Sequence, residues 1–292
     1  MIKKHLRNFL AFLLVLAITT SSVITASPVS AAVNPGVGDV KFKWSRDIFE
    51  GVTLNHILSD NATGRQKIYT TEFNPQTSPV KPILNYGDYV MGGDIMSEMV
   101  SQTEQEGKKV IFAINGDAYD TSNGVSNGLM IKDGILISTS NGSEGVGFKS
   151  DGTVLFGKTD FNIIANSPSA SIKIDHVNKE RKLNTQNVYL LTEQFDKTTR
   201  STQPGVEVVL KVTTPGYSGI RIGQEITATV VSVNQVDENP NENSTSILPG
   251  QIVLSSHSES SQYAALSALQ KDEQITLSLI HISEPTRHSL IS

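Results

Sequence analysis

Apolar and polar positions change their spacing along the chain, and each spacing predicts a different element. Val110–Ile114 is apolar at every position, which predicts a buried strand with both faces covered. Between Asp94 and Glu106, apolar residues recur at helical spacing, so we expect a helix. Asp94 is expected to cap this helix and Gly107 to end it. Its predicted buried face consists of Ile95, Met96, Met99, Val100 and Thr103.

Short apolar runs separated by turn residues predict strands over much of the remaining chain. Asp133-Gly134 and Asp151-Gly152 each divide two such runs, which is a strong hairpin signal because Gly accepts positive φ. We therefore interpret both aspartates as turn formers. Further strands are expected at Lys67–Phe73, Phe161–Ile164, Ala170–Ile174, Val188–Leu191, Val206–Val212 and Glu225–Val233, and a second helix at Ser260–Leu269. The pattern predicts an α+β fold of mostly β-strands in mixed sheets with a few helices, incomplete at the C-terminus.

The polar turn after Val110–Ile114 is the first candidate for chemistry. Asn115-Gly116-Asp117 follows this strand directly. Polar groups at the end of a buried strand are where α/β-type folds commonly place a ligand. Asn-Gly is also a common turn sequence, so a plain turn is the alternative.

The first 32 residues have the features of a secretory signal peptide. Lys3, Lys4 and Arg7 form a basic region, Phe9–Ile18 is a short apolar region, and small residues lead up to Ala32. A spanning helix needs about 20 apolar residues, so we expect cleavage and no stable membrane insertion. An uncleaved anchor is the alternative. The mature protein is then secreted, extracellular or at the cell surface, and residues 33–46 are expected to be a flexible N-terminal segment.

Composition and charge exclude several classes of protein. The chain has no cysteine, which excludes disulfides and thiolate metal sites. Without the three basic residues of the signal, 21 Lys and Arg stand against 29 Asp and Glu, a net charge of −8. No block of basic residues stands out, so we expect no nucleic-acid partner. The six histidines lack close spacing, so a histidine-based metal site is not expected.

Three motifs occur in a fixed order, at Ala113–Tyr119, Gly128–Gly134 and Gly147–Gly152. In sequence and spacing they resemble the phosphodiester glycosidase family. The best-known activity of that family removes N-acetylglucosamine from a phosphodiester, and bacterial members are often described as exopolysaccharide-related. The resemblance covers about residues 47–276, which we expect to form the N-terminal part of such a domain. Weaker matches are Gln66–Phe73, Asn187–Leu191, Gly205–Leu210 and Ile247–Gly250.

The resemblance implies a hydrolase that breaks the C1–O bond between a sugar and a phosphate. The transition state has oxocarbenium character, so the site must position the sugar, stabilise positive charge at C1 and activate water. The resemblance implies Asp117 as the catalytic carboxylate and Asn115 as the residue that orients the substrate. Further substrate-binding residues that it implies are Gly116, Tyr119, Asn127 and Gly128. For Tyr119, a place in the core is an equal alternative to stacking on a sugar.

A calcium site is a second possibility in the same stretch. Asp117, Asp120 and Asn123 recur every three residues and offer hard oxygen ligands that suit Ca²⁺. The spacing is not that of an EF-hand, which needs oxygens at alternate positions. Apart from this possible Ca²⁺, we expect no metal and no cofactor.

The end of the chain has a different character. Leu277–Arg287 is similar to one reading frame of a sequencing adapter, so we expect residues 277–292 to be an artefact outside the fold. This also removes His281 and His288 as candidate ligands. The alternative is a genuine strand, Ile275–Ile282, followed by a tail broken by proline. Arg-x-Ala-x-Gly-like and Asp-Gly-Gly-Gly-Ser-like segments follow at this point in the family. Neither occurs here, so we expect an inactive fragment.

Two classes of function remain open at this point. The first is a secreted hydrolase that acts on a sugar phosphodiester in cell-wall or exopolysaccharide material. The second is a non-catalytic surface module that binds glycans on the same scaffold. An α+β surface domain of unknown role is a third possibility. In the first two classes the partner is a glycan or a sugar phosphodiester.

Overall fold

The computed structural model describes residues 37–139, 144–181, 186–238 and 244–282. The chain divides into two compact units. The first consists of Met1–Arg46 and Thr53–Glu72, and the second of Asp47–Val52 and Phe73–Ser292. Each unit is described by itself. The signal peptide expected at residues 1–32 lies outside the described residues.

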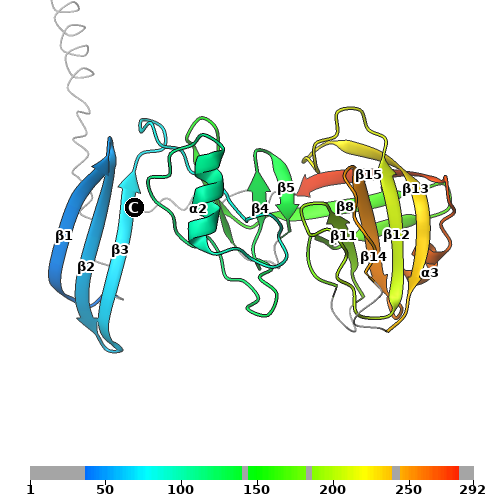
Figure 1. The fold of residues 1–292 in the computed structure, drawn as a ribbon, viewed down its shortest axis with the longest axis horizontal. Helices are drawn as coiled ribbons and strands as arrows, with labels where there is room; N and C mark the ends of the chain where they lie inside the picture. The colour runs from blue at the N-terminus through cyan, green and yellow to red at the C-terminus, as the bar shows by residue number, and fades with distance from the viewer. Residues whose placement is uncertain (1–36, 140–143, 182–185, 239–243, 283–292) are drawn as a thin grey trace, which may run out of the picture. The chain divides into compact units, whose positions relative to one another are not determined.

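The first unit is built on a three-stranded sheet with the order β1-β2-β3. Its strands are β1 (Asp39–Phe49), β2 (Val52–Asn61) and β3 (Gly64–Phe73), visible in blue and cyan in Figure 1. The strand expected at Lys67–Phe73 is confirmed. The flexible segment expected at residues 33–46 is wrong from Asp39 onward, because regular pairing with β2 orders this stretch as a strand. Across the sheet, the rings of His56 and Tyr69 stack with centroids 4.4 Å apart.

The main part of the second unit is an eight-stranded sheet with the order β10-β11-β14-β12-β13-β15-β8-β9. Its neighbours pair antiparallel, except that β10 and β11 pair parallel. The sheet is therefore mixed. Its strands are β8 (Asp160–Asn166), β9 (Ser171–Ile174), β10 (His176–Val177), β11 (Val188–Thr192), β12 (Gly205–Val212), β13 (Glu225–Val236), β14 (Gln251–His257) and β15 (Gln274–Ile282).

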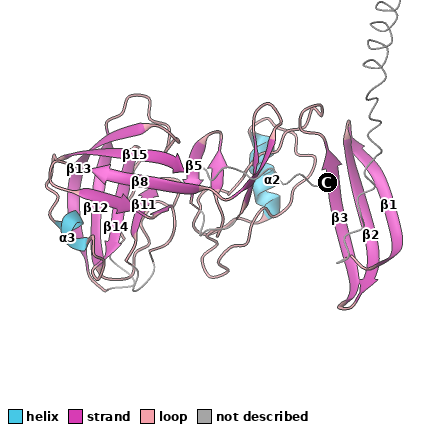
Figure 2. Cartoon of the chain, turned by 180° about the vertical axis from the view of Figure 1, so that it is seen from behind, coloured by secondary structure: helices cyan, strands magenta, loops and turns pink. Residues whose placement is uncertain are grey.

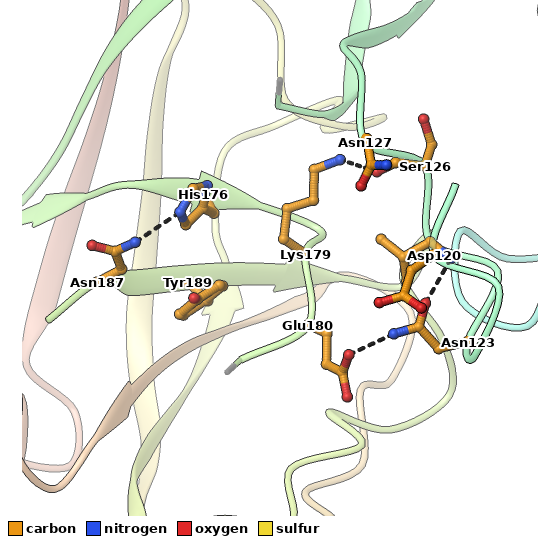
Figure 3. A pocket seen from close by; sticks show the side chains of 10 residues that line it. Asp120, Asn123, Ser126, Asn127, His176, Lys179, Glu180, Asn187 and Tyr189 are labelled. Carbon is orange, nitrogen blue, oxygen red and sulfur yellow. Dashed lines mark hydrogen bonds between the residues drawn. The ribbon is translucent and has the colours of Figure 1, made fainter. Parts of the chain in front are cut away.

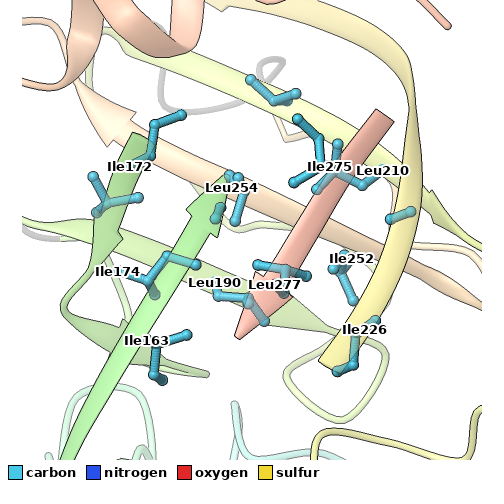
Figure 4. Close-up of a cluster of buried hydrophobic side chains, with 14 of the residues drawn as sticks. Ile163, Ile172, Ile174, Leu190, Leu210, Ile226, Ile252, Leu254, Ile275 and Leu277 are labelled. Carbon is cyan, nitrogen blue, oxygen red and sulfur yellow. The ribbon is translucent and has the colours of Figure 1, made fainter. Parts of the chain in front are cut away.

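This sheet curls until its two ends share one hydrophobic core. Strand β9 at one end lies near β11 at the other, and the short helix α3 (Tyr263–Ser267) packs against β9, β12, β13 and β14. Figure 4 shows side chains from all parts of the sheet meeting in this core. Strands β11 and β14 are buried on both faces, which explains the apolar runs Val188–Leu191 and Ile252–Leu254 within them. The core includes Ile163, Ile172, Leu190, Leu210, Ile226, Leu254, Leu266 and Ile275.

The expected hairpins are confirmed. Strands β4 (Met130–Lys132) and β5 (Ile135–Ser138) pair antiparallel, as do β6 (Gly145–Phe148) and β7 (Val154–Gly157). Asp133 has φ 53° and Gly134 has φ 76°, a conformation that suits the two central residues of a tight hairpin turn. Both hairpins thus follow from their local sequence.

The first helix, α2, spans Met96–Gln105 and differs from the prediction in two ways. Its N-cap is Ile95, with no side-chain hydrogen bond, so capping by Asp94 is wrong. The Asp94 carboxylate instead accepts the backbone N–H of Asp88 at 3.0 Å. Of the predicted apolar face only Thr103 is buried. The expected end at Gly107 is confirmed, with φ 82° and a backbone bond to Glu104.

The buried strand expected at Val110–Ile114 is not formed. This segment has no regular secondary structure, and the side chains of Phe112 and Ile114 are 39% and 69% exposed. An apolar run becomes a buried strand only where neighbouring strands pair with it, and in the described part of the chain none does. The buried strand between the predicted helix and the polar turn is therefore absent from the described residues.

The expectation that residues 277–292 lie outside the fold is wrong for their first six residues. Strand β15 continues to Ile282 and pairs with β13 and β8. Leu277 and Leu279 are buried in the core, because alternate positions of this strand face it. The strand given as the alternative is thus present, whereas the adapter origin of residues 277–292 stays a prediction. Residues 283–292 lie outside the described residues.

The fold class is confirmed as α+β, with mostly strands in mixed sheets and few helices. Figure 2 shows how far strands outnumber helices in the part of the chain that is described. No helix among the described residues is long and apolar enough to cross a membrane.

Candidate functional site

The loop from Asp117 to Gly128 is closed by hydrogen bonds to the Asp117 carboxylate. Oδ2 of Asp117 accepts from the Ser126 hydroxyl at 2.6 Å and from the backbone N–H of Gly128, and Oδ1 accepts from the N–H of Ala118 at 2.8 Å. A Cβ at Gly128 would overlap this carboxylate, so the contact requires Gly. Tyr119 and Ser126 form a backbone bridge across the loop.

The tip of the loop is a tight turn around Asp120. The carbonyl of Asp120 accepts the N–H of Gly124 at 2.7 Å, and Oδ1 of Asp120 accepts the Ser122 hydroxyl at 2.6 Å. Gly124 has φ 76°, and a Cβ there would lie 2.7 Å from the backbone nitrogen of Gly93. The turn therefore depends on Gly for its conformation and for its close packing against Gly93.

A second segment, His176–Glu180, faces this loop from the large sheet. Asn178 fixes its path with φ 50° and a fully buried side chain. Its amide nitrogen donates to the carbonyl of Ile137 at 2.7 Å, and its amide oxygen accepts the N–H of Thr192 at 2.8 Å. Asn tolerates this left-handed conformation better than most residues. The turn at Asn178 brings Lys179 and Glu180 toward the loop.

Two contacts join the segment to the loop (Figure 3). The Lys179 ammonium, in a residue only 5% exposed, donates to the carbonyl of Ser126 and, at 3.4 Å, to that of Gly128. The amide nitrogen of Asn123 donates to the Glu180 carboxylate. Because both contacts use polar groups, hydrogen bonds rather than apolar packing determine the position of this segment relative to the loop.

A pocket of about 210 Å³ lies between these walls. Figure 3 shows the loop residues on one side and residues of the sheet on the other. Most of the lining residues have polar side chains, including two carboxylates and three amides, and the rings of His176 and Tyr189 also line the pocket. Its members are Asp120, Asn123, Val125, Ser126, Asn127, His176, Lys179, Glu180, Asn187 and Tyr189.

His176 lies at the sheet side of the pocket. Its ring packs against Tyr189 with centroids 5.1 Å apart, and the amide nitrogen of Asn187 lies 2.9 Å from Nε2. Since an amide nitrogen donates, Nε2 accepts and the proton of the neutral ring lies on Nδ1. Nδ1 is buried and has no partner among the described residues. Burial lowers the pKa of His176 below 6.5, and Lys179 and Lys173 act in the same direction against the opposing charge of Asp175.

The structure distributes the predicted site residues over three places. Asn127 lines the pocket. Asp117 and Gly128 adjoin it and hold the loop. Asn115, Gly116 and Tyr119 are exposed on the loop or just before it and are not among the lining residues.

The sheet side of the pocket was missed by sequence analysis. His176, Lys179, Glu180, Asn187 and Tyr189 were not proposed as site residues. Lys179-Glu180 belongs to a dense charged stretch of the chain, Lys179–Lys182. A cluster of charges has no spacing that indicates a site, so the sequence carried no signal for these residues.

No group of three or more His, Cys, Asp or Glu that could hold a metal ion occurs in the described ranges. The oxygens considered for Ca²⁺ have other roles: those of Asp117 and Asp120 accept hydrogen bonds within the loop, and Oδ1 of Asn123 accepts the N–H of Val125 at 2.9 Å. Calcium binding here stays a prediction.

Comparison with known proteins gives a likeness of fold. No protein-family model matches the chain, and no curated protein matches it. A crystal structure described as that of a hypothetical protein from Synechocystis is similar, with a TM-score of 0.60 and 13% sequence identity. The similarity covers 83% of this chain and 42% of the other, so this chain spans well under half of that protein. At this identity the likeness shows the fold alone.

Proposed function

We propose that this chain belongs to a secreted hydrolase of the phosphodiester glycosidase type. Its substrate is an N-acetylglucosamine-like sugar joined to a phosphodiester in cell-wall or exopolysaccharide material. The observation that carries the proposal is the position of the loop that connects two of the family-like motifs. This loop, Asp117–Gly128, forms one wall of a polar pocket that contains two carboxylates.

Glu180 is the catalytic carboxylate in this proposal. One of its oxygens accepts from Asn123, and no described residue donates to the other. A carboxylate oxygen that is open to the pocket can orient water or stabilise positive charge at C1. Asp120, by contrast, uses one oxygen for Ser122. The amides of Asn127 and Asn187 suit the hydroxyl and N-acetyl groups of a sugar.

Asp117 acts through the loop in this proposal. Its carboxylate accepts three hydrogen bonds from the loop, so it positions Ser126 and Asn127 at the pocket. The catalytic role that the resemblance implied for Asp117 stays a prediction. The two roles differ in what an Asp117→Asn variant changes.

The test is hydrolysis of the methyl phosphodiester of N-acetylglucosamine 1-phosphate by the full chain in ¹⁸O-water. That this chain is itself inactive stays a prediction, and turnover in this test would contradict it. Release of N-acetylglucosamine together with unlabelled methyl phosphate supports the proposal, because C1–O cleavage leaves all the original oxygens on the phosphate. Label in methyl phosphate, which reports P–O cleavage, contradicts it. Glu180→Gln should slow the reaction about 100-fold or more. The matched control is Glu225→Gln at an exposed position of β13.

A non-catalytic glycan-binding module is the second candidate. It is favoured by the pocket's cation, Lys179, which is bonded to backbone carbonyls and so contributes little to binding a phosphate. Sugar binding without turnover under the same assay would select this candidate. If the chain neither binds the sugar nor hydrolyses the substrate, the remaining candidate is an α+β surface domain with another role.

A further inference from the structure

The charges that line the pocket are unevenly available to a ligand. Lys179 is buried and donates to the carbonyls of Ser126 and Gly128. Its positive charge is thus used mainly to hold the loop. The carboxylates of Asp120 and Glu180 lie on the two opposite walls, as Figure 3 shows. Burial keeps His176 in its neutral form at pH 7.

The groups that remain for a ligand are mainly acceptors and amides. One oxygen of Glu180 and the side-chain amide of Asn127 receive no hydrogen bond from any described residue. Asn187 uses its nitrogen for His176, which leaves its oxygen for a donor. Hydroxyl groups of a sugar can donate to such oxygens, whereas an anion would lie beside two carboxylates. A juxtaposition of like charges is strongly unfavourable at a binding site.

The size of the pocket limits the ligand to a small one. Pockets for drug-sized molecules occupy roughly 300–1,000 Å³, and this one measures about 210 Å³. A single sugar ring matches this volume better than an oligosaccharide does. Tyr189, only 3% exposed, closes the sheet side of the pocket beside the amides, and its ring packs against that of His176.

We infer that the pocket is a subsite for one uncharged sugar ring and that it rejects anionic sugars and phosphate. The inference rests on the proposed function and names the part of the substrate that enters: the sugar, with the phosphate held outside these walls. Glu180 is then also a specificity-determining residue, because its charge disfavours an anionic ring.

The experiment measures binding to the full chain by saturation-transfer NMR and calorimetry. The probes are methyl N-acetylglucosaminide, methyl glucuronide and inorganic phosphate. We expect the neutral sugar to bind at least about tenfold more tightly than the glucuronide, which is a modest effect for one like-charge contact. Phosphate should not compete with the neutral sugar. Equal or tighter binding of glucuronide or phosphate overturns the inference, as does the absence of any sugar binding.

Two variants test whether the discrimination arises in this pocket. Glu180→Gln keeps an acceptor for Asn123 but removes the charge, so the preference for the neutral ring should shrink severalfold. Asn127→Ala should weaken binding of the neutral sugar without changing the preference for the neutral sugar over the glucuronide. Glu225→Gln is the control and should change neither. An unchanged preference in Glu180→Gln contradicts the inference.

The outcomes separate this inference from the proposed function. Selective binding of the neutral sugar without hydrolysis supports the proposed subsite and contradicts the proposed hydrolase function. If the protein hydrolyses the substrate but binds anionic and neutral sugars equally, the subsite inference is wrong and the proposed hydrolase function is supported.

Discussion

Two regions of the second unit have similarly apolar sequences and very different burial. In the eight-stranded sheet, β11 and β14 are buried almost throughout. In residues 73–157, which contain α2 and β4–β7, large apolar side chains are exposed, including Ile95, Ile114 and Phe156. The buried cluster of this second region is small and consists of Val90, Val125, Met130 and Ile137.

The difference shows that apolar sequence determines burial only together with a partner surface. Each interior strand of the large sheet has a neighbour on both sides, and α3 packs against β9, β12, β13 and β14. Among the described strands, β6 and β7 pair only with each other, and Val146 lies opposite Phe156 on one exposed face. The second region is ordered instead by polar contacts, of which the Asp117 loop is the main example. The candidate site lies where the two kinds of region meet.

The largest expected contrast is between apolar truncations in the two regions. Leu254→Ala should lower the free energy of unfolding by about 2–5 kcal/mol, because Leu254 is fully buried and leaves a cavity. Phe156→Ala, at a side chain 66% exposed, should change it by less than about 0.5 kcal/mol. Urea denaturation of both variants measures the contrast. A large decrease in the free energy of unfolding of Phe156→Ala would contradict the contrast between the two regions, since it would mean that the hairpin is covered in solution.

A second contrast concerns buried charge in the well-packed region. Glu207 is fully buried on β12 and accepts hydrogen bonds from the hydroxyls of Thr199, Ser201 and Ser255. Glu207→Ala leaves these donors unsatisfied and should destabilise the protein by about 2–3 kcal/mol. Glu207→Gln retains an acceptor and should lose less. The measurement is again the urea midpoint.

The control for Glu207 is Glu104→Ala on the exposed surface of α2. It should stay within about 0.5 kcal/mol of the wild type. Equal losses in Glu104→Ala and Glu207→Ala would show that burial does not separate the two regions.

The parts of the fold that could be predicted are those determined locally or by uniform burial. Asp133-Gly134 specifies its hairpin because both residues adopt positive φ. Strands β11 and β12 were predictable because their apolar runs lie where both faces are covered. Val110–Ile114 carries the same signal and forms no strand, because pairing partners are not encoded in the run itself.

The candidate site could be predicted only on its loop side. Asn127 and Asp117 lie in or beside the motifs that sequence analysis selected. Lys179 and Glu180 are more than 50 residues farther along the chain, and they reach the loop because Asn178 turns the backbone through a left-handed conformation. Such a turn and such a long-range contact have no periodicity in the sequence, so no spacing rule would have found them.

The third prediction concerns the polar contacts that order the loop. Asp117→Ala removes the acceptor for Ser126 and Gly128 and should cost about 1–2 kcal/mol of loop stability. Amide hydrogen exchange at Gly128 measures this locally. Asp151→Ala is the control, because Asp151 accepts the Thr153 N–H in an exposed hairpin turn and should have a smaller effect.

Asp117→Asn separates a positioning role from a catalytic one. If Asp117 only positions the loop, the rate of hydrolysis by Asp117→Asn should fall only as far as the exchange protection at Gly128 falls. A loss of hydrolysis with protection at Gly128 unchanged would contradict this role and support the catalytic role that the resemblance implied.

The smallest expected effect is the pH dependence that His176 contributes. Burial lowers its pKa in the folded state below 6.5, so the unfolded chain binds the proton more readily. The contribution of His176 to stability is therefore complete above pH 6.5 and is lost as the pH falls through 6.5 toward the lowered value. His176→Gln should make the decline in stability between pH 7 and about 5 shallower, whereas the control Glu225→Gln, at an exposed position of β13, should leave the decline unchanged. Urea midpoints at several pH values measure the slopes. Identical slopes for the wild type and His176→Gln would mean that the ring is solvated, and the pocket wall at the edge of the sheet would then be as open as the exposed region.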